Sequence, residues 1–216
     1  MATPFVAGSG ALLLEAFGRH KVIYKGARTR FQTTASGVPS SRTDGDPMQT
    51  LSQAGAGLIN VHKAVHATSF VSPGELRLND TAHSTPIHTI FVENFAKTTQ
   101  IYRITHSPAG TATTIQNNEA IPYPVPLSKA SASVSFSTAT LKLAPGAIGA
   151  FSVTINPPTG LDAKTFPVYS GMIRITSAAD DMQVSYLGVA AALKDMQVID
   201  TSSDCEYEHY FLPVHH

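Results

Sequence analysis

Short segments with apolar residues at every second position occupy most of the chain after residue 73. Phe151–Ile155 reads FSVTI, so apolar and hydroxyl side chains alternate strictly. This alternation places the apolar side chains on one face of a half-buried β-strand. The pattern predicts strands at Glu75–Leu78, Ile87–Asn94, Gln100–His106, Val134–Phe136, Thr140–Leu143, Ala150–Ile155, Ser170–Thr176 and Val184–Ala190.

Turn-forming sequences separate these segments. Ser107–Gly110 reads SPAG, and Ala144–Gly146 reads APG, and both are rich in residues that favour chain reversal. About seven or eight short strands with such turns are typical of an antiparallel β-sandwich of the immunoglobulin or fibronectin type III kind. The predicted fold class is therefore mainly β, with the sandwich at residues 72–195 and a tail at 196–216.

Two helices are expected before the sandwich, within residues 1–67. Residues 1–24 are apolar on nearly every side of a helix and contain Gly8 and Gly10. A helix of that kind belongs in the centre of a larger α/β domain, where a neighbouring element presses on its glycines. Residues 25–53 are polar and predict a loop, and residues 57–67 predict a second helix.

Charge and composition exclude several classes of partner. Lys plus Arg and Asp plus Glu each number 15, so neither nucleic acid nor a membrane is an expected partner. No apolar run reaches the roughly 18 residues that a membrane-spanning helix needs. Only 14% of the residues are charged, which fits a β-rich secreted protein. The first eighteen residues have no Lys or Arg before their apolar run, unlike a signal peptide.

Two histidines and one serine suggest sites that the surrounding sequence does not support. His62 and His66 have the spacing that places two imidazoles on one zinc ion, but Lys63 stands where the metalloprotease motif has glutamate. Surface histidines near a helix end are the preferred interpretation. Gly8-Ser9-Gly10 resembles the centre of a nucleophile elbow, but Ala7 and Ala11 stand where the G-x-S-x-G motif has glycines, and no strand precedes it. Close helix packing explains a small residue there better than catalysis does.

The remaining acidic, histidine and cysteine residues give no stronger signal. Asp44–Asp46 reads DGD but lacks the other ligands of a calcium loop, so a polar turn is expected. Near the end of the chain, a loose metal site could involve Cys205, Glu208, His209, His215 and His216. From the residues alone we predict no metal site and no self-contained active site.

The opening of the chain resembles a known protease family. Residues 1–8 read MATPFVAG, similar to the second part of the subtilisin-family signature GTSMATPxxAG. Residues 53–65 resemble the segment that closes subtilase catalytic domains. Residues 72–76 resemble the entry to the fibronectin-like domain that follows in large subtilases, and residues 167–173 and 185–189 resemble its last strands. The two helices would then be remnants of an α/β subtilisin-like domain.

This resemblance implies the C-terminal part of a secreted, fungal, subtilisin-like serine endopeptidase. Such a protease hydrolyses peptide bonds of a polypeptide substrate with a Ser–His–Asp triad and no organic cofactor. Its nucleophile would immediately precede Met1, and its Asp and His would lie upstream, so the chain is expected to be inactive. The resemblance places only an active-site scaffold here, at Met1, Ala2, Thr3, Pro4, Ala7 and Gly8.

The alternative function is a non-catalytic β-sandwich module that binds or spaces partners. In that case residues 72–195 would fold alone, with residues 1–67 as a vestige. Without its sheet, the first helix is expected to expose apolar surface, dock on the sandwich or self-associate. Asn79–Thr81 reads NDT, an N-glycosylation acceptor if the chain is secreted.

Overall fold

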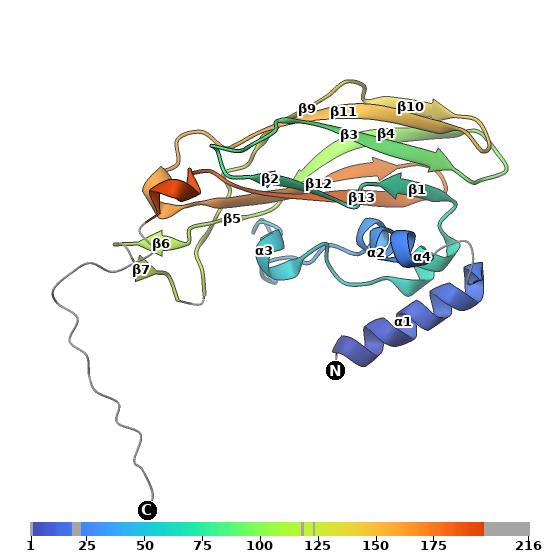
Figure 1. The fold of residues 1–216 in the computed structure, drawn as a ribbon, viewed down its shortest axis with the longest axis horizontal. Helices are drawn as coiled ribbons and strands as arrows, with labels where there is room; N and C mark the ends of the chain where they lie inside the picture. Colours follow the sequence, from blue (N-terminus) through green and yellow to red (C-terminus); the bar gives the residue numbers. More distant parts are fainter. Residues whose placement is uncertain (1, 19–22, 118, 123, 197–216) are drawn as a thin grey trace, which may run out of the picture.

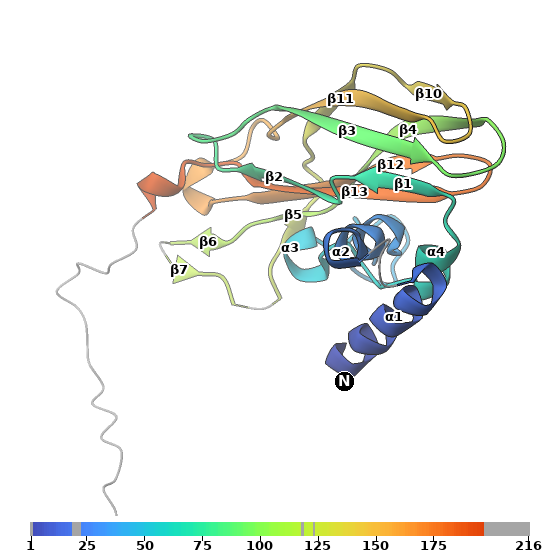
Figure 2. The ribbon, with the colours of Figure 1, turned by 45° about the vertical axis from the view of Figure 1, so that its right-hand side comes forward.

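A β-sandwich covered on one side by helices forms the molecule (Figures 1 and 2). The structure, a computed structural model, describes residues 2–18, 23–117, 119–122 and 124–196. The predicted tail at 196–216 lies outside the described residues except for its first residue. No helix within the described ranges has the length and apolar character needed to cross a membrane.

Two sheets stack to form the sandwich, and a small hairpin extends from it. The four-stranded sheet has the order β1-β3-β11-β9, and the seven-stranded sheet has the order β10-β4-β12-β13-β2, with β5 paired to β12 and β8 to β5. The strands of the four-stranded sheet are β1 Ser69–Ser72, β3 Ile87–Asn94, β11 Ile148–Asn156 and β9 Ser133–Phe136. Those of the seven-stranded sheet are β10 Thr140–Leu143, β4 Gln100–Pro108, β12 Val168–Thr176, β13 Asp181–Val189, β2 Glu75–Asn79, β5 Thr111–Ala112 and β8 Leu127–Ser128. The hairpin pairs β6 Ile115–Gln116 with β7 Glu119–Ala120.

The sequence-based prediction of a mainly β sandwich is confirmed, with one correction to its topology. All eight predicted strands are present, and β3 and β10 have the predicted bounds. Strand β2 pairs with β13 in parallel, so the seven-stranded sheet is mixed and not purely antiparallel. The alternation of side chains could not reveal this, because it depends only on which face is buried and not on strand direction.

The core lies between the two sheets, where the alternating apolar residues face one another. Ile90 and Val92 on β3 and Phe151, Val153 and Ile155 on β11 are all buried. The opposing sheet contributes Tyr102 and Ile104 from β4, Tyr169, Ile173 and Ile175 from β12, and Met182, Val184 and Tyr186 from β13.

Two tyrosines in this core lie across glycines of the neighbouring strand. In the register of β12 and β13, Gly171 is opposite Tyr186, and Tyr169 is opposite Gly188. A Cβ added at Gly171 would lie 2.7 Å from Tyr186 Cζ, and one at Gly188 would lie 2.7 Å from Tyr169 Cζ. The missing side chains leave the space that each ring occupies, so both glycines are required by close packing.

Tyr186 reaches across β12 to a histidine on β4. Its hydroxyl lies 2.8 Å from His106 Nε2. Burial raises the pKa of Tyr186 and lowers the pKa of His106. The folded protein therefore holds His106 as a neutral imidazole in conditions where an unfolded chain begins to protonate it.

We expect the free energy of unfolding to fall as the pH is lowered from 7 to 5. An unfolded histidine has a pKa of about 6.5, and His106 has a lower pKa when folded, so the unfolded state binds more protons below this pH. The contribution is fully present above the unfolded pKa and is lost as the pH falls toward the folded pKa. Urea unfolding at several pH values should show a shallower dependence for His106→Gln than for the wild type. An unchanged slope in His106→Gln would contradict the assignment.

The helical part differs from the sequence-based prediction. The helices are α1 Ala2–Phe17, α2 Ile23–Thr34, α3 Leu51–Ala54 and α4 Val61–His66. The predicted helix over residues 1–24 is wrong in extent, because α1 ends at Phe17. Gly18 follows with a φ of 74°, and its N–H donates to Leu14 O. The predicted loop at 25–53 is wrong where α2 and α3 lie. The helix predicted for 57–67 begins only after Asn60, whose side chain caps it by accepting from Lys63 N.

Candidate functional site: the seam between helices and sheet

Helices α2, α3 and α4 lie along the outer face of the seven-stranded sheet, beneath β12 and β13 (Figures 1 and 2). Ser170 and Met172 on β12 are buried although they face away from the sandwich core. Met172 packs instead in a second cluster with Leu51, Ala109, Met48 and Leu187. These two strands are therefore buried on both faces, which the period-two pattern did not predict.

We call the interface between residues 26–67 and strands β12 and β13 the seam. Backbone and side-chain hydrogen bonds across the seam join residues that are far apart in the sequence. Gln183 on β13 is 1% exposed and donates from Nε2 to Ala56 O at 2.6 Å. Leu51 N donates to Ser170 Oγ at 3.1 Å, and Gly110 N donates to Met48 O at 2.8 Å. Because each bond satisfies a polar group that the seam removes from water, the helical segment has a defined position on the sheet.

The carboxylate of Glu75, at the edge of the seven-stranded sheet, binds side chains of α2. Glu75 on β2 accepts from Arg28 Nη2 at 3.0 Å, from Gln32 Nε2 at 2.7 Å and from Arg77 Nη2 at 2.6 Å. The hydrogen bond from Arg77, with those from the α2 side chains, lowers the pKa of Glu75. The cluster is partly exposed, so its main effect is to fix the position of α2.

The predicted active-site scaffold lies on α1, and α1 makes little contact with the sheet. Met1 is outside the described residues, and Ala2, Thr3, Pro4, Ala7 and Gly8 are all exposed. An added Cβ at Gly8 or Gly10 would meet no atom within 4 Å, so no element presses on these glycines here. Large apolar side chains of the same helix are exposed, namely Phe5, Val6, Leu12 and Leu14. Of the three outcomes expected for the first helix, the structure shows exposed apolar surface.

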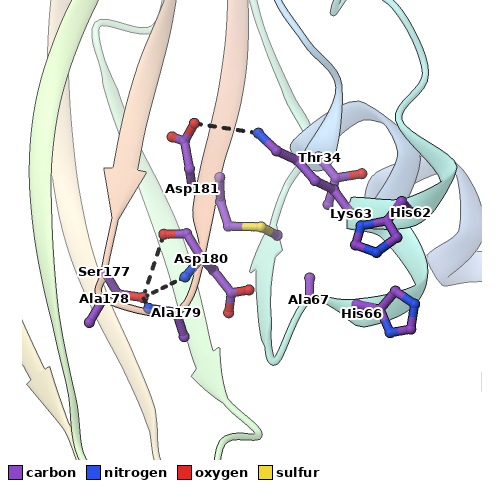
Figure 3. Close-up of a pocket in the computed structure, with 11 residues that line it drawn as sticks. Thr34, His62, Lys63, His66, Ala67, Ser177, Ala178, Ala179, Asp180 and Asp181 are labelled. Atoms are coloured by element: carbon purple, nitrogen blue, oxygen red, sulfur yellow. Dashed lines mark hydrogen bonds and ion pairs between the residues drawn. The ribbon is translucent and has the colours of Figure 1, made fainter.

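The serine and histidine candidates are not brought together. Ser9 is buried, and its hydroxyl donates to Phe5 O within α1 at 2.7 Å. His62 and His66 lie on α4 with ring centroids 4.5 Å apart. They line a pocket with the β12–β13 turn, where Lys63 Nζ lies 3.6 Å from Asp181 Oδ2 (Figure 3). Within the described ranges, no group of three or more His, Cys, Asp or Glu side chains could hold a metal ion.

The other predicted positions lie on turns or outside the described residues. Asp46 accepts from Ser41 Oγ at 2.6 Å in a turn at Gly45, whose φ is 89°. Asn79 is exposed at the end of β2, with a φ of 56°. Cys205, Glu208, His209, His215 and His216 are outside the described residues.

One arginine at the seam was not singled out from the sequence. Arg30 on α2 is 7% exposed, and its Nη1 donates to Ala64 O at 2.9 Å and to Ala67 O at 3.2 Å. Burial lowers the pKa of Arg30. Its guanidinium carbon lies 4.6 Å from the centroid of the Phe17 ring and 5.9 Å from that of Phe70. Only the tertiary structure reveals this residue, because its partners come from α1, α4 and β1.

Comparison with known proteins supports the sandwich and not a particular activity. Residues 76–187 match the Fn3-like domain family. No curated protein matches the chain. Similar solved structures include PapD-like domain 7 of human CEP192, at 10% identity and a TM-score of 0.43, with 59% of this chain and 88% of that chain covered. Another is the Pseudomonas aeruginosa CupB2 chaperone, at 10% identity and a TM-score of 0.37, with 58% of this chain and 57% of that chain covered.

Proposed function

Because this chain belongs to the Fn3-like domain family, we propose that it is the non-catalytic C-terminal part of a secreted subtilisin-like serine endopeptidase. In this proposal the sandwich is a rigid module held against the last helices of the catalytic domain. The parent protein hydrolyses peptide bonds of polypeptides, and the present chain has no hydrolytic activity of its own.

The seam is the observation that carries this proposal. Residues 53–65, which resemble the end of a subtilase catalytic domain, lie in the segment that covers β12 and β13, and Ala56 O in this segment accepts the bond from buried Gln183. A module joined by a flexible linker would not bury polar side chains against its neighbour. The matched family is also found in subtilisin-associated C-terminal regions, which agrees with the MATPFVAG resemblance.

The exposed scaffold on α1 also supports an inactive chain. Ser9, the serine nearest the signature, uses its hydroxyl within the helix, and the exposed apolar face of α1 suits a helix that a catalytic sheet covers in the parent. In the isolated chain this face is expected to self-associate. Exposed Asn79 is the proposed glycosylation site of the secreted parent. Sedimentation velocity of the purified chain tests the self-association. The intact mass of the chain secreted from eukaryotic cells tests glycosylation at Asn79.

Incubation with a fluorophosphonate probe tests the proposed lack of activity. We expect no labelling of the purified chain, because an activated serine needs a base that removes its proton. An active subtilisin labelled in parallel is the positive control, and Ser9→Ala is the matched variant. Stoichiometric labelling that disappears in Ser9→Ala would overturn the proposal and assign an active site to α1.

The non-catalytic binding module remains a second candidate because of a separate observation. Ile87, Phe91 and Ile148 are exposed on the outer face of the four-stranded sheet. Their strands β3 and β11 are adjacent, with Ile148 opposite Glu93, so these side chains share one face of the sandwich. Strand β1 begins at Ser69, so the test uses residues 68–196 instead of the predicted 72–195. Folding of this chain alone, with the stability of the whole chain, would favour this candidate.

A further inference from the structure

A cavity lies where α1 and α2 meet β1 and the end of β3. Its volume is about 510 Å³, and three aromatic rings line it, from Phe17, Phe70 and Phe95. The charged residues of the lining are Arg30 and Glu93. Cavities of roughly 300–1,000 Å³ with apolar walls and few polar groups are the usual binding sites for small molecules.

The Arg30 guanidinium already has aromatic and hydrogen-bonding contacts within the protein. The rings of Phe17 and Phe70 both lie within 6 Å of its central carbon, at 4.6 and 5.9 Å. Nη1 donates both of its hydrogens, to Ala64 O and Ala67 O. These contacts hold the planar group in one orientation, so its remaining N–H groups have fixed directions.

The other edge of this guanidinium has no partner among the described residues. Arg30 forms hydrogen bonds only through Nη1 in that part of the chain, which leaves Nε–H and the Nη2 hydrogens. Nε–H and one Nη2–H are parallel, and this fork binds both oxygens of a carboxylate. Arg30 is 7% exposed and lines the cavity, so an anion that accepts from these donors is bound where little water competes, and a charge-assisted hydrogen bond is strong there.

We propose that this cavity binds a carboxylate joined to an apolar group. The carboxylate accepts from Nε and Nη2 of Arg30, and the apolar group packs among Phe17, Phe70 and Phe95. The ligand has two possible sources with this same chemistry, a free small acid and the C-terminal residue of a polypeptide. This binding site is independent of the proposed protease parentage.

The charges around the cavity favour a ligand with a single negative charge. Glu93 also lines the cavity, and no ion pair joins it to Arg30 within the described ranges. Asp180 is close enough to favour the charged form of Arg30. Two carboxylates near one guanidinium repel a dianion more strongly than a monoanion, so a phosphate monoester is a poor ligand compared with a carboxylate.

Titration followed by 15N–1H spectra of arginine side chains tests the proposal directly. We expect 4-phenylbutyrate to shift the Arg30 Nε–H signal saturably, with a Kd on the order of 1 mM or below. The neutral amide, 4-phenylbutanamide, should leave this signal unchanged. A tetrapeptide ending in leucine, with a free carboxylate in one sample and an amide in another, distinguishes a chain end from a small acid. No saturable shift with either acid, or equal shifts with acid and amide, would overturn the proposal.

Three variants test the geometry without removing Arg30, which also supports the fold. Phe95→Ala should weaken binding about tenfold by removing an apolar wall of the cavity. Phe91 lies on β3 outside the cavity lining, so Phe91→Ala should bind the ligand as the wild type does. Glu93→Gln should tighten binding roughly two- to fivefold by removing a like charge. Weaker binding in Glu93→Gln, or equal losses in both phenylalanine variants, would contradict the assigned cavity.

Discussion

Gly171→Ala is expected to lower the free energy of unfolding by about 3 kcal/mol, at the upper end of the usual cost of overpacking. The added Cβ would overlap Tyr186 Oη and would lie 2.7 Å from Cζ and 2.8 Å from Cε1. The ring cannot move aside easily, because Tyr186 is 1% exposed and its hydroxyl is bonded to His106 Nε2 at 2.8 Å. Urea denaturation followed by circular dichroism would measure the change.

A glycine in open space provides the matched control. Gly10 lies inside α1, and an added Cβ there would meet nothing within 4 Å. Gly10→Ala should therefore leave stability unchanged or raise it by up to about 1 kcal/mol, since alanine is the better helix former. Similar losses in Gly10→Ala and Gly171→Ala would show that steric overlap with Tyr186 is not the cause.

A double variant separates the overlap from other effects of the substitution. Tyr186→Leu alone should be destabilising, because it removes a buried ring and its hydrogen bond. Combined with Gly171→Ala, it should cost less than the sum of the two single changes, because the shorter side chain leaves room for the new Cβ. Strictly additive losses would contradict the proposed contact between position 171 and the ring.

The strands could be predicted from the sequence because one face of each is buried in the core. FSVTI at Phe151–Ile155 shows the alternation clearly, and its odd positions are buried in the structure. The segment of strand β12 showed a similar alternation, but this pattern gave no sign that the helical segment buries the other face of β12 and β13 as well. The pairing of Gly171 with Tyr186 depends on strand register, which no local pattern contains.

Helix α2 escaped prediction because its stability comes from tertiary contacts. Its sequence, IYKGARTRFQTT, is polar and includes a glycine and three threonines, none of which favours a helix strongly. In the structure Arg30 and Gln32 bond to other elements, and Thr34 Oγ1 donates to Arg30 O. Tertiary packing commonly outweighs weak helix propensity in this way.

The candidate sites were less predictable than the fold. The MATPFVAG motif, which predicts a scaffold on α1, consists of adjacent residues, whereas the cavity at Arg30 assembles residues from positions 17 to 95. Arg30 itself lies in a stretch that looked like a loop. A buried arginine surrounded by aromatic rings has no sequence signature, because its neighbours are determined by how the helices pack on the sheet.

Removal of the helical segment is expected to destabilise the sandwich by about 3–5 kcal/mol, a large share of the 5–15 kcal/mol typical of a folded domain. A chain of residues 68–196 keeps every strand of the sandwich and the bonds from Thr68 and Ser69 to Asp180. It loses the cover over β12 and β13, so Met172 and Leu187 lose their partner Leu51 in the second cluster. Exposed apolar side chains on a sheet should also increase binding of a hydrophobic dye.

A chain of residues 23–196 provides the control for this truncation. It retains α2, α3 and α4 and lacks only α1, which buries Leu13 and Ser9. Its free energy of unfolding should be less than about 2 kcal/mol below that of the whole chain, because the seam with the sheet is intact. Denaturation midpoints of the three chains, measured at one protein concentration, decide between the two functional candidates. If residues 68–196 unfold cooperatively at the same midpoint as residues 23–196, the sandwich is an autonomous module. A large difference means that it depends on the helices, as a fixed part of a longer protease would.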